Sequence, residues 1–174
     1  AMGGMSHWSS TYTYYNTIMR SVDGTAWDMY VGYAPWKERS WYGSTIHNGS
    51  MWVIGGVYTT YGTSYMDDAW SSTDATHWVN QNADAPFLGR NRDAAVSLDG
   101  KLWIIGGNPN HDVWYSVDGR EWIQSQGYSD FLTVSLGATV HDGGIFLVTE
   151  EAVWAGDVIH GTLHAIFSPT IPHH

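Results

Sequence analysis

The clearest alternation of apolar and polar stretches lies between residues 94 and 125. Residues 94–98 are largely apolar, and Asp99-Gly100 follows them as a dipeptide that is preferred in tight hairpin turns. Residues 102–105 are apolar without a break, which is typical of a strand that is buried on both faces. Two more short stretches, 113–116 and 122–125, flank the turn residues 117–120. This pattern predicts four short antiparallel strands joined by tight turns.

The same pattern recurs along the chain. Residues 48–56, Asn-Gly-Ser-Met-Trp-Val-Ile-Gly-Gly, have a close counterpart at 99–107 and a degenerate one at 142–150. A second motif, Ser-x-Asp-x-x-x-Trp, occurs at 21–27, 72–78 and 116–122. Repeats of about fifty residues indicate propellers or solenoids, and hairpins at these spacings favour a propeller. We therefore predict one domain, 1–174, whose approximate units are 3–54, 55–105, 106–148 and a partial unit 149–174.

Composition supports an all-β chain and excludes several function classes. The 174 residues include 11 Trp, 11 Tyr and 20 Gly, which favour strands and turns. With 17 Asp and Glu against 7 Lys and Arg, the acidic chain lacks the basic surface that nucleic acids and anionic membranes attract. The absence of cysteine excludes disulfides and cysteine zinc sites. No signal-peptide pattern and no apolar run of about 20 residues is present, so we expect a soluble protein without membrane insertion, of undetermined compartment.

These motifs resemble those of the kelch-repeat β-propellers, and most closely a microbial branch with the form Asp-Val-Trp-Tyr-Ser-x-Asp-Gly-x-x-Trp, which stands here at 112–122. Many kelch repeats also carry an Arg sixteen residues before the Gly pair, as Arg39 precedes Gly55 and Arg90 precedes Gly106. The third repeat lacks both the Arg and the Gly pair. The resemblance implies kelch-like β-propeller blades of four antiparallel strands, with about 3–3.5 blades in this chain.

The Ser-x-Asp-Gly motif also resembles the Asp-box of sialidases, which normally has one more residue between Asp and Trp. In either family the Asp side chain accepts hydrogen bonds from backbone amides of its own turn. We therefore predict structural roles for Asp23, Asp74 and Asp118. The arginine triad and the Tyr–Glu pair of sialidases are not recognisable among the five arginines of this chain.

Two families of loops are expected to converge over the central channel of a propeller. The loops that enter the first strands, 34–39 and 85–92, hold four of the seven basic residues, and the loops that leave the second strands are 57–61 and 108–111. This clustering predicts a positive surface that captures a carboxylate, with aromatic side chains that stack beside it. The candidate ligand-binding residues are Arg39, Arg90, Arg92, Trp36, Tyr58, Tyr61 and His111. The alternative for Arg39 and Arg90, and also for Arg92, is that they brace the loops of neighbouring blades.

No catalytic residue, metal ligand or cofactor is assigned from the sequence. The nine histidines lack the spacing of ligand pairs on helices or zinc fingers. Two acidic pairs, Asp67-Asp68 and Glu150-Glu151, occupy matching repeat positions before third strands. They are interpreted as solvated loop charges, with an acid/base pair or a cation site as the alternative.

The sequence therefore favours a non-enzymatic ligand-binding or interaction module, whose ligand is a peptide, a protein or a glycan. One alternative is a sugar-active propeller enzyme similar to the sialic-acid mutarotases or to sialidases. Another is a structural module whose edges mediate assembly. Fold alone does not decide among these classes.

The number of repeats predicts a second copy as a partner. Propellers close with about 4–8 blades, so 3–3.5 blades leave two open edges. Two copies related by a two-fold axis along the channel would close one ring of six or seven blades, with residues 3–31 of one chain near residues 151–167 of the other. The alternative is that the chain is a piece of a longer protein.

Overall fold

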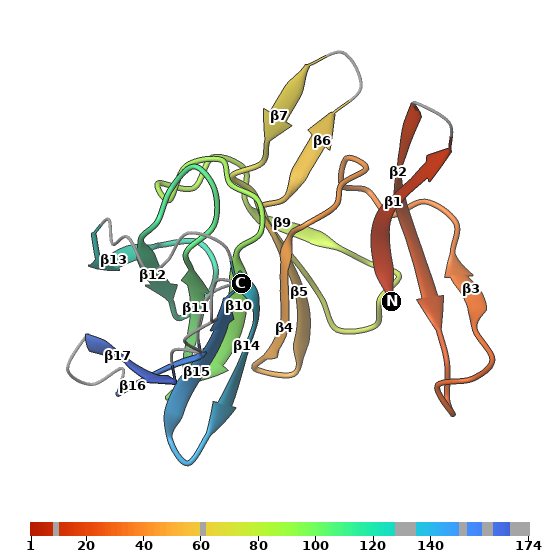
Figure 1. Ribbon diagram of the computed structural model, residues 1–174. Coiled ribbons are helices and arrows are strands. Elements are labelled where there is room, and N and C mark those ends of the chain that lie inside the picture. The colour runs from red at the N-terminus through yellow and green to blue at the C-terminus, as the bar shows by residue number, and fades with distance from the viewer. Residues whose placement is uncertain (9–10, 60–61, 128–134, 150–152, 158–161, 168–174) are drawn as a thin grey trace, which may run out of the picture.

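The computed structural model describes the chain except for residues 9–10, 60–61, 128–134, 150–152, 158–161 and 168–174 (Figure 1). Every regular element in the described residues is a β-strand, and all strand pairs are antiparallel. The all-β class predicted from composition and repeats is therefore confirmed. None of the described residues forms a helix.

Three sheets have four strands each. The second sheet comprises β4 (Gly43–His47), β5 (Ser50–Ile54), β8 (Ala69–Ser72) and β9 (Val79–Asn82). The third comprises β10 (Ala94–Leu98), β11 (Lys101–Ile105), β12 (Val113–Ser116) and β13 (Ile123–Gln126). The fourth comprises β14 (Ser135–His141), β15 (Gly144–Thr149), β16 (Val153–Asp157) and β17 (Thr162–Phe167). The four strands predicted for residues 94–125 are those of the third sheet.

The first sheet has three strands, β1 (Met2–Trp8), β2 (Thr11–Arg20) and β3 (Asp28–Val31), and a separate hairpin is formed by β6 (Val57–Thr59) and β7 (Thr63–Tyr65). When Ser21 is aligned with Ser72, the end of β2 and β3 correspond to β8 and β9, the outer strands of the second sheet. Within the described residues, the first sheet has no counterpart of β4. Strands β16 and β17, which fall in the partial unit predicted for residues 149–174, are the third and fourth strands of the fourth sheet.

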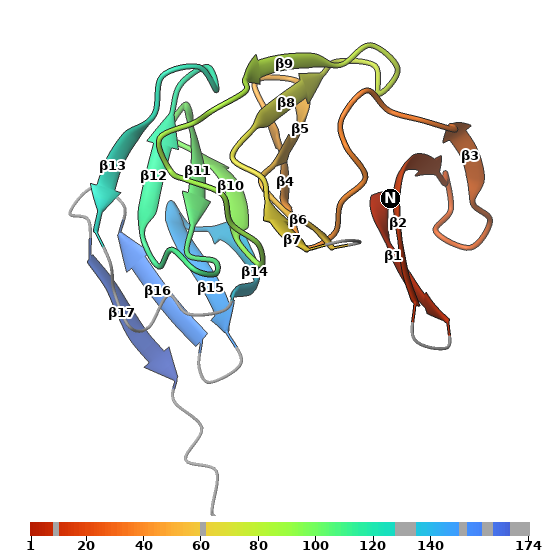
Figure 2. The ribbon, with the colours of Figure 1, turned by 90° about the horizontal axis from the view of Figure 1, so that it is seen from above.

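The sheets stand side by side like the leaves of a fan (Figure 2). Strands β4, β10 and β14, the first strand of each four-stranded sheet, are neighbours. Each seam between sheets is filled by its own apolar cluster. One joins the first and second sheets through Ile18, Trp36 and Val53, the next joins the second and third through Trp52 and Leu102, and the last contains Val96 and Ile145.

The aspartates of the repeated Ser-x-Asp motif lie in the turns that precede the last strand of the first three sheets. An Oδ1 oxygen of Asp74 accepts hydrogen bonds from the amides of Thr76 and His77, at 2.8 and 2.7 Å. Asp23 and Asp118 accept two amide hydrogen bonds in the same way. These bonds lower the pKa of all three carboxyl groups, because they stabilise the ionised form. The contacts are those of the structural role predicted for these residues.

Arg39 and Arg90 connect distant strands within their own sheets. Nη1 of Arg39 donates to the Gly55 carbonyl at 2.8 Å, and its guanidinium makes a two-pronged contact with the Asp68 carboxylate. Nη1 of Arg90 donates to the Gly106 carbonyl at 2.9 Å and to Asp112 at 2.7 Å. The spacing of sixteen residues between each Arg and Gly therefore corresponds to a hydrogen bond. Both arginine side chains are fully buried.

We predict that Arg90→Ala lowers the free energy of unfolding by about 3–5 kcal/mol, because the Asp112 carboxylate loses its buried partner. The matched control is Arg120→Ala, which removes an exposed side chain that donates to Gln81 and should cost less than about 1 kcal/mol. Urea unfolding followed by tryptophan fluorescence measures both. Equal losses in the two variants would show that the Arg90 contacts contribute little.

Candidate functional site

Three of the residues expected to bind ligand are enclosed by the protein. Arg39 and Arg90 are 0% exposed, and Trp36 is 2% exposed with its ring packed edge-on against Trp78 at 4.3 Å. These side chains present no surface to a ligand. The side-chain contacts of Arg39 and Arg90 are those of the bracing alternative, but they connect strands within one sheet rather than loops of neighbouring sheets. Trp36 belongs to the core.

The other candidates lie nearer the surface, except that Tyr61 falls outside the described residues. Tyr58 is half-buried on β6, with the Lys37 ammonium 4.3 Å from the centre of its ring and Tyr14 5.3 Å away on the first sheet. His111 is half-buried between β11 and β12. Arg92 is half-buried at the entrance to β10. The Lys37–Tyr58 contact brings the loop before β4 against the hairpin that follows β5.

Arg92 pairs with a residue that the sequence did not single out. Its guanidinium lies 4.8 Å from the ring centre of Trp41, and its amide donates to the Trp41 carbonyl at 2.7 Å. The two residues occupy the same repeat position, two after each bracing Arg, and both have positive φ angles, 53° and 56°. A non-glycine residue rarely adopts this conformation, and such strain clusters at functional sites.

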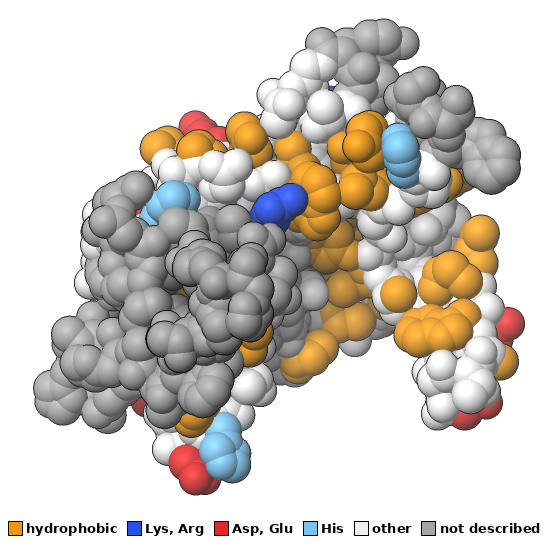
Figure 3. Space-filling view, in the orientation of Figure 1, with side chains coloured by type: hydrophobic (Ala, Val, Ile, Leu, Met, Phe, Trp, Pro, Cys, Tyr) orange, Lys and Arg blue, Asp and Glu red, His pale blue; other side chains and the backbone are white. Residues whose placement is uncertain are grey.

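We call Lys37, Trp41, Tyr58 and Arg92 the cation–aromatic mouth. A backbone bridge between Ser40 and Val57 holds the segments of Trp41 and Tyr58 next to each other. Trp41 is 44% exposed, so its indole remains available for contact. In Figure 3 a basic side chain lies among hydrophobic side chains near the middle of the visible face.

Asp93, which directly follows Arg92, is a buried acid with a raised pKa. Neither carboxylate oxygen has a hydrogen-bond partner, and Asp93 is 6% exposed. A Cβ atom on Gly43 would stand 2.5 Å from one of these oxygens, and one on Gly55 would stand 3.3 Å from the other. Burial raises the pKa of Asp93 to about 7, against the opposing effect of the nearby Arg90 charge.

The corresponding residue of the preceding repeat is Tyr42, which fills the equivalent space between the first and second sheets. Its ring lies beside Gly3, its Cβ atom lies beside Gly56, and its hydroxyl donates to the Met2 carbonyl. Burial raises the pKa of this phenol to about 12. Equivalent positions in the two seams are therefore filled by different side chains, the phenol of Tyr42 in one and the carboxyl group of Asp93 in the other.

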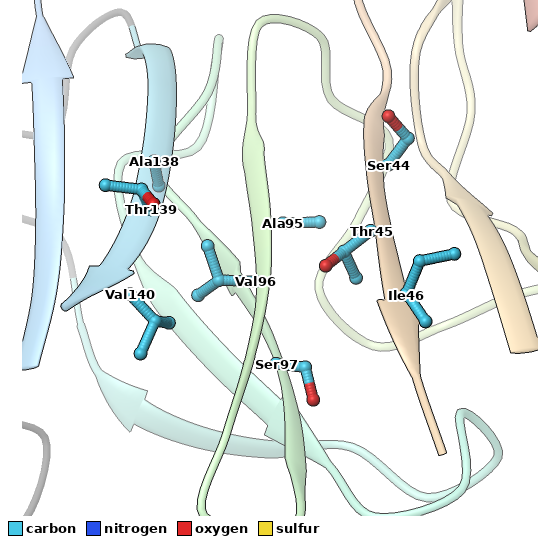
Figure 4. Close-up of a pocket in the computed structure, with 9 residues that line it drawn as sticks. All are labelled: Ser44, Thr45, Ile46, Ala95, Val96, Ser97, Ala138, Thr139 and Val140. Atoms are coloured by element: carbon cyan, nitrogen blue, oxygen red, sulfur yellow. The ribbon is translucent and has the colours of Figure 1, made fainter. Parts of the chain in front are cut away.

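A hollow of about 370 Å³ lies along the first strands of the four-stranded sheets (Figure 4). Its lining has no charged residue and consists of small apolar and hydroxyl side chains: Ser44, Thr45, Ile46, Ala95, Val96, Ser97, Ala138, Thr139 and Val140. Below it, Nδ1 of the buried His47 lies 2.8 Å from Oγ of Ser97, which ties β4 to β10. This surface lacks the charges of the mouth.

In the part of the chain that the structure describes, no group of three or more His, Cys, Asp or Glu side chains is arranged to hold a metal ion. Of the two acidic pairs noted in the sequence, Glu150-Glu151 lies outside the described residues and Asp67-Asp68 lies within them. Asp68 is not a solvated charge, because it binds Arg39. No helix in the described residues has the length and apolar character needed to cross a membrane.

Comparison with known proteins shows the fold. No protein-family model and no curated protein matches the chain. Among solved structures, 121 chains match, including the structure of YjhT, with a TM-score of 0.66 and 17% identity over 91% of this chain. The match spans 60% of the YjhT chain, so this sequence corresponds to only part of that protein's length. The chain therefore has a fold similar to that of YjhT.

We predict that Asp93→Asn stabilises the protein at pH 8 and removes part of its pH dependence. Because the pKa of Asp93 is raised to about 7, the folded state holds one more proton than the unfolded state between about pH 4 and 7. Stability of the wild type should therefore fall across that window, by at most about 1.4 kcal/mol per pH unit from this group, and level off above it.

Urea unfolding at half-unit intervals from pH 4.5 to 8 measures this slope. Asp118→Asn is the matched control, because hydrogen bonds lower the pKa of Asp118 and its stabilising contribution is lost only in more acidic solution. Parallel pH profiles for the wild type and Asp93→Asn would contradict the prediction.

Proposed function

We propose that this chain is a non-enzymatic ligand-binding module of kelch-like propeller blades that recognises an acidic peptide, protein or glycan. The observation that carries the proposal is the Trp41–Arg92 pair, in which an exposed indole supports a guanidinium at two strained positions of successive repeats. In general, a guanidinium stacks on an aromatic ring through its face and binds a carboxylate through the N–H groups at its edge.

The charge distribution supports an acidic ligand. The chain has a formal net charge of −10, yet the mouth carries two cations, Lys37 and Arg92, each against an aromatic ring. A local positive site attracts anions, whereas the rest of an acidic protein repels them, so an acidic ligand is directed to that site. The rings of Trp41 and Tyr58 add flat apolar surface for a sugar face or a peptide side chain.

We expect Arg92→Ala to weaken binding of acidic probes at least about tenfold while the melting temperature changes little. Suitable probes are N-acetylneuraminic acid and the peptide Glu-Tyr-Glu, with N-acetylglucosamine and Gln-Tyr-Gln as neutral counterparts, measured by titration calorimetry. Arg120→Ala, which removes a cation outside the mouth, should bind as the wild type does. Unchanged binding of every acidic probe by Arg92→Ala, or no preference for acidic over neutral probes, would contradict the proposal.

A sugar-active enzyme, similar to the sialic-acid mutarotases or sialidases, is the second candidate, and Asp93 is the observation that favours it. A carboxyl group with a pKa near 7 suits general acid–base catalysis, and it directly follows Arg92 in sequence. Its enclosure by Gly43 and Gly55 favours the structural role instead. Ring-form exchange of N-acetylneuraminic acid followed by NMR, with Asp93→Asn as the comparison, distinguishes the two.

We also propose that a second copy of the chain is a partner that closes the ring. A purely structural module for assembly would use the same partnership. The sheet of β1–β3 and the sheet of β14–β17 stand at opposite ends of the fan, where such a seam would form (Figure 2). Side chains such as Tyr33, 85% exposed, and Met29, 67% exposed, enlarge the apolar surface at the first sheet.

Light scattering on the purified chain tests this partnership. We expect a mass of twice 19.4 kDa that does not change over a hundredfold dilution range about the micromolar level. A stable mass of 19.4 kDa would exclude ring closure by two copies.

A further inference from the structure

A serine–histidine pair lies between the first strands of the second and third sheets. Ser97 on β10 is half-buried and belongs to the lining of the hollow of about 370 Å³, whereas His47 at the end of β4 is 2% exposed. Nδ1 of His47 lies 2.8 Å from Oγ of Ser97. The hollow therefore presents a hydroxyl group whose hydrogen-bond partner is an imidazole shielded from water.

The contacts of the other ring nitrogen determine where the imidazole carries its proton. Nε2 of His47 lies 3.2 Å from the carbonyl oxygen of Val117, which can only accept a hydrogen bond, so the proton belongs on Nε2. The amide of the exposed Asn48 lies 3.1 Å from the same nitrogen, and a half-turn of that amide lets its oxygen accept from Nε2 as well. Nδ1 is then the acceptor, and the Ser97 hydroxyl donates to it.

Trp52 holds the histidine from another side. Its indole Nε1 donates to the His47 carbonyl at 3.2 Å, and its ring lies edge-on to the imidazole with the ring centres 6.2 Å apart. A hydroxyl, an imidazole that accepts from it and a group that orients the imidazole are the parts that activate a serine nucleophile. Here the carbonyl of Val117 orients the base, where the well-known triads use a carboxylate.

The adjoining seam shows that the fold does not require this polar pair. The repeats place Leu98 at the position of His47 and Val140 at the position of Ser97, on the first strands of the third and fourth sheets. Leu98 is buried in the apolar cluster of that seam. Hydrocarbon side chains thus occupy the equivalent positions, so packing alone does not account for a serine and a histidine here.

We propose that Ser97 and His47 form a catalytic dyad that hydrolyses small uncharged esters in the hollow. The lining indicates the substrate class, because it carries no charged group and because Ile46, Ala138 and Val140 offer apolar surface to a short acyl chain. The hollow shares no residue with the cation–aromatic mouth. The inference therefore goes beyond the binding role proposed for the mouth and does not depend on it.

The direction of the hydrogen bond gives the steps of the reaction. Oγ of Ser97 attacks the carbonyl carbon of the ester while Nδ1 of His47 takes the hydroxyl proton. The bond between the carbonyl carbon and the alcohol oxygen breaks, the imidazolium gives that proton to the departing alcohol, and the acyl group remains on Ser97. Water then attacks the acyl group and gives a proton to His47, which returns it to Ser97 as the acid leaves. In Figure 4 the Thr45 hydroxyl points from β4 toward β10, where it can donate to the oxygen that becomes negative.

A fluorophosphonate probe and 4-nitrophenyl acetate test the dyad. We expect the probe to form a covalent adduct that mass spectrometry locates on Ser97, and the protein to hydrolyse the ester with saturation kinetics. Ser97→Ala should lose this adduct and lower kcat/KM at least about a hundredfold. Ser64→Ala, which removes an exposed serine of β7 outside the hollow, is the matched control and should react as the wild type does.

His47→Asn separates a catalytic role from a structural one. An Asn side chain keeps an acceptor oxygen close to the position of Nδ1, so the bond from Ser97 persists, but an amide takes up no proton at neutral pH. We expect this variant to lose both hydrolysis and labelling, as Ser97→Ala does, while circular dichroism melting shows that it is folded.

Three results would overturn the proposal. One is the absence of an adduct on Ser97 in the wild type. Another is hydrolysis that Ser97→Ala retains, which would assign the reaction to another group of the chain. The third is an unchanged rate in folded His47→Asn, because the pair would then serve only to join β4 to β10.

Discussion

A buried guanidinium determines the geometry of the second and third sheets. In each, an Arg from the loop before the first strand reaches the carbonyl that ends the second strand and the Asp that precedes the third. The amide of the same Gly, Gly55 or Gly106, donates in turn to the carbonyl of that Asp. A buried ion pair is tolerated only when its hydrogen bonds are complete, so these three segments are positioned together. The cation–aromatic mouth depends on this arrangement, since Trp41 and Arg92 each stand two residues beyond a bracing Arg.

The repeated Asp turns, which precede the last strand of the first three sheets, are a second recurring feature. The Asp turns hold their backbone by internal hydrogen bonds, and one of them presents Gly119 to the indole of Trp52. Arg120, in the same turn, donates to Gln81 and accepts at its carbonyl from Asn82 of the neighbouring sheet. A turn that is rigid by itself therefore also aligns two sheets. Loss of one Asp would loosen a turn and a seam at once.

The fold class and the strands of the third sheet could be predicted because they depend on local pattern: apolar runs, Asp-Gly turns and repeat length. The site could be predicted only in part. Repeat position indicated which loops converge, but not which side chains turn inward, so Trp36, Arg39 and Arg90 were expected on the surface. The signal that could have corrected this is Asp-x-Trp, at 68–70 and 112–114, which marks an acid directly before the third strand of both sheets. Nothing in the sequence marked the burial of Asp93, because it follows from two glycines far away along the chain.

Comparison of repeats within the chain separates scaffold from surface. Positions that hold the second and third sheets together carry the same residue in both, as Arg39 and Arg90 do. The positions two and three residues later share a backbone conformation and a place in the seam, yet one pair is Trp and Tyr and the other is Arg and Asp. If these positions served only the fold, the same packing problem would favour the same solution. Their differences give each seam its own chemistry, apolar and phenolic on one side and cationic and acidic on the other, so the repeated scaffold does not present the same side chains at every seam.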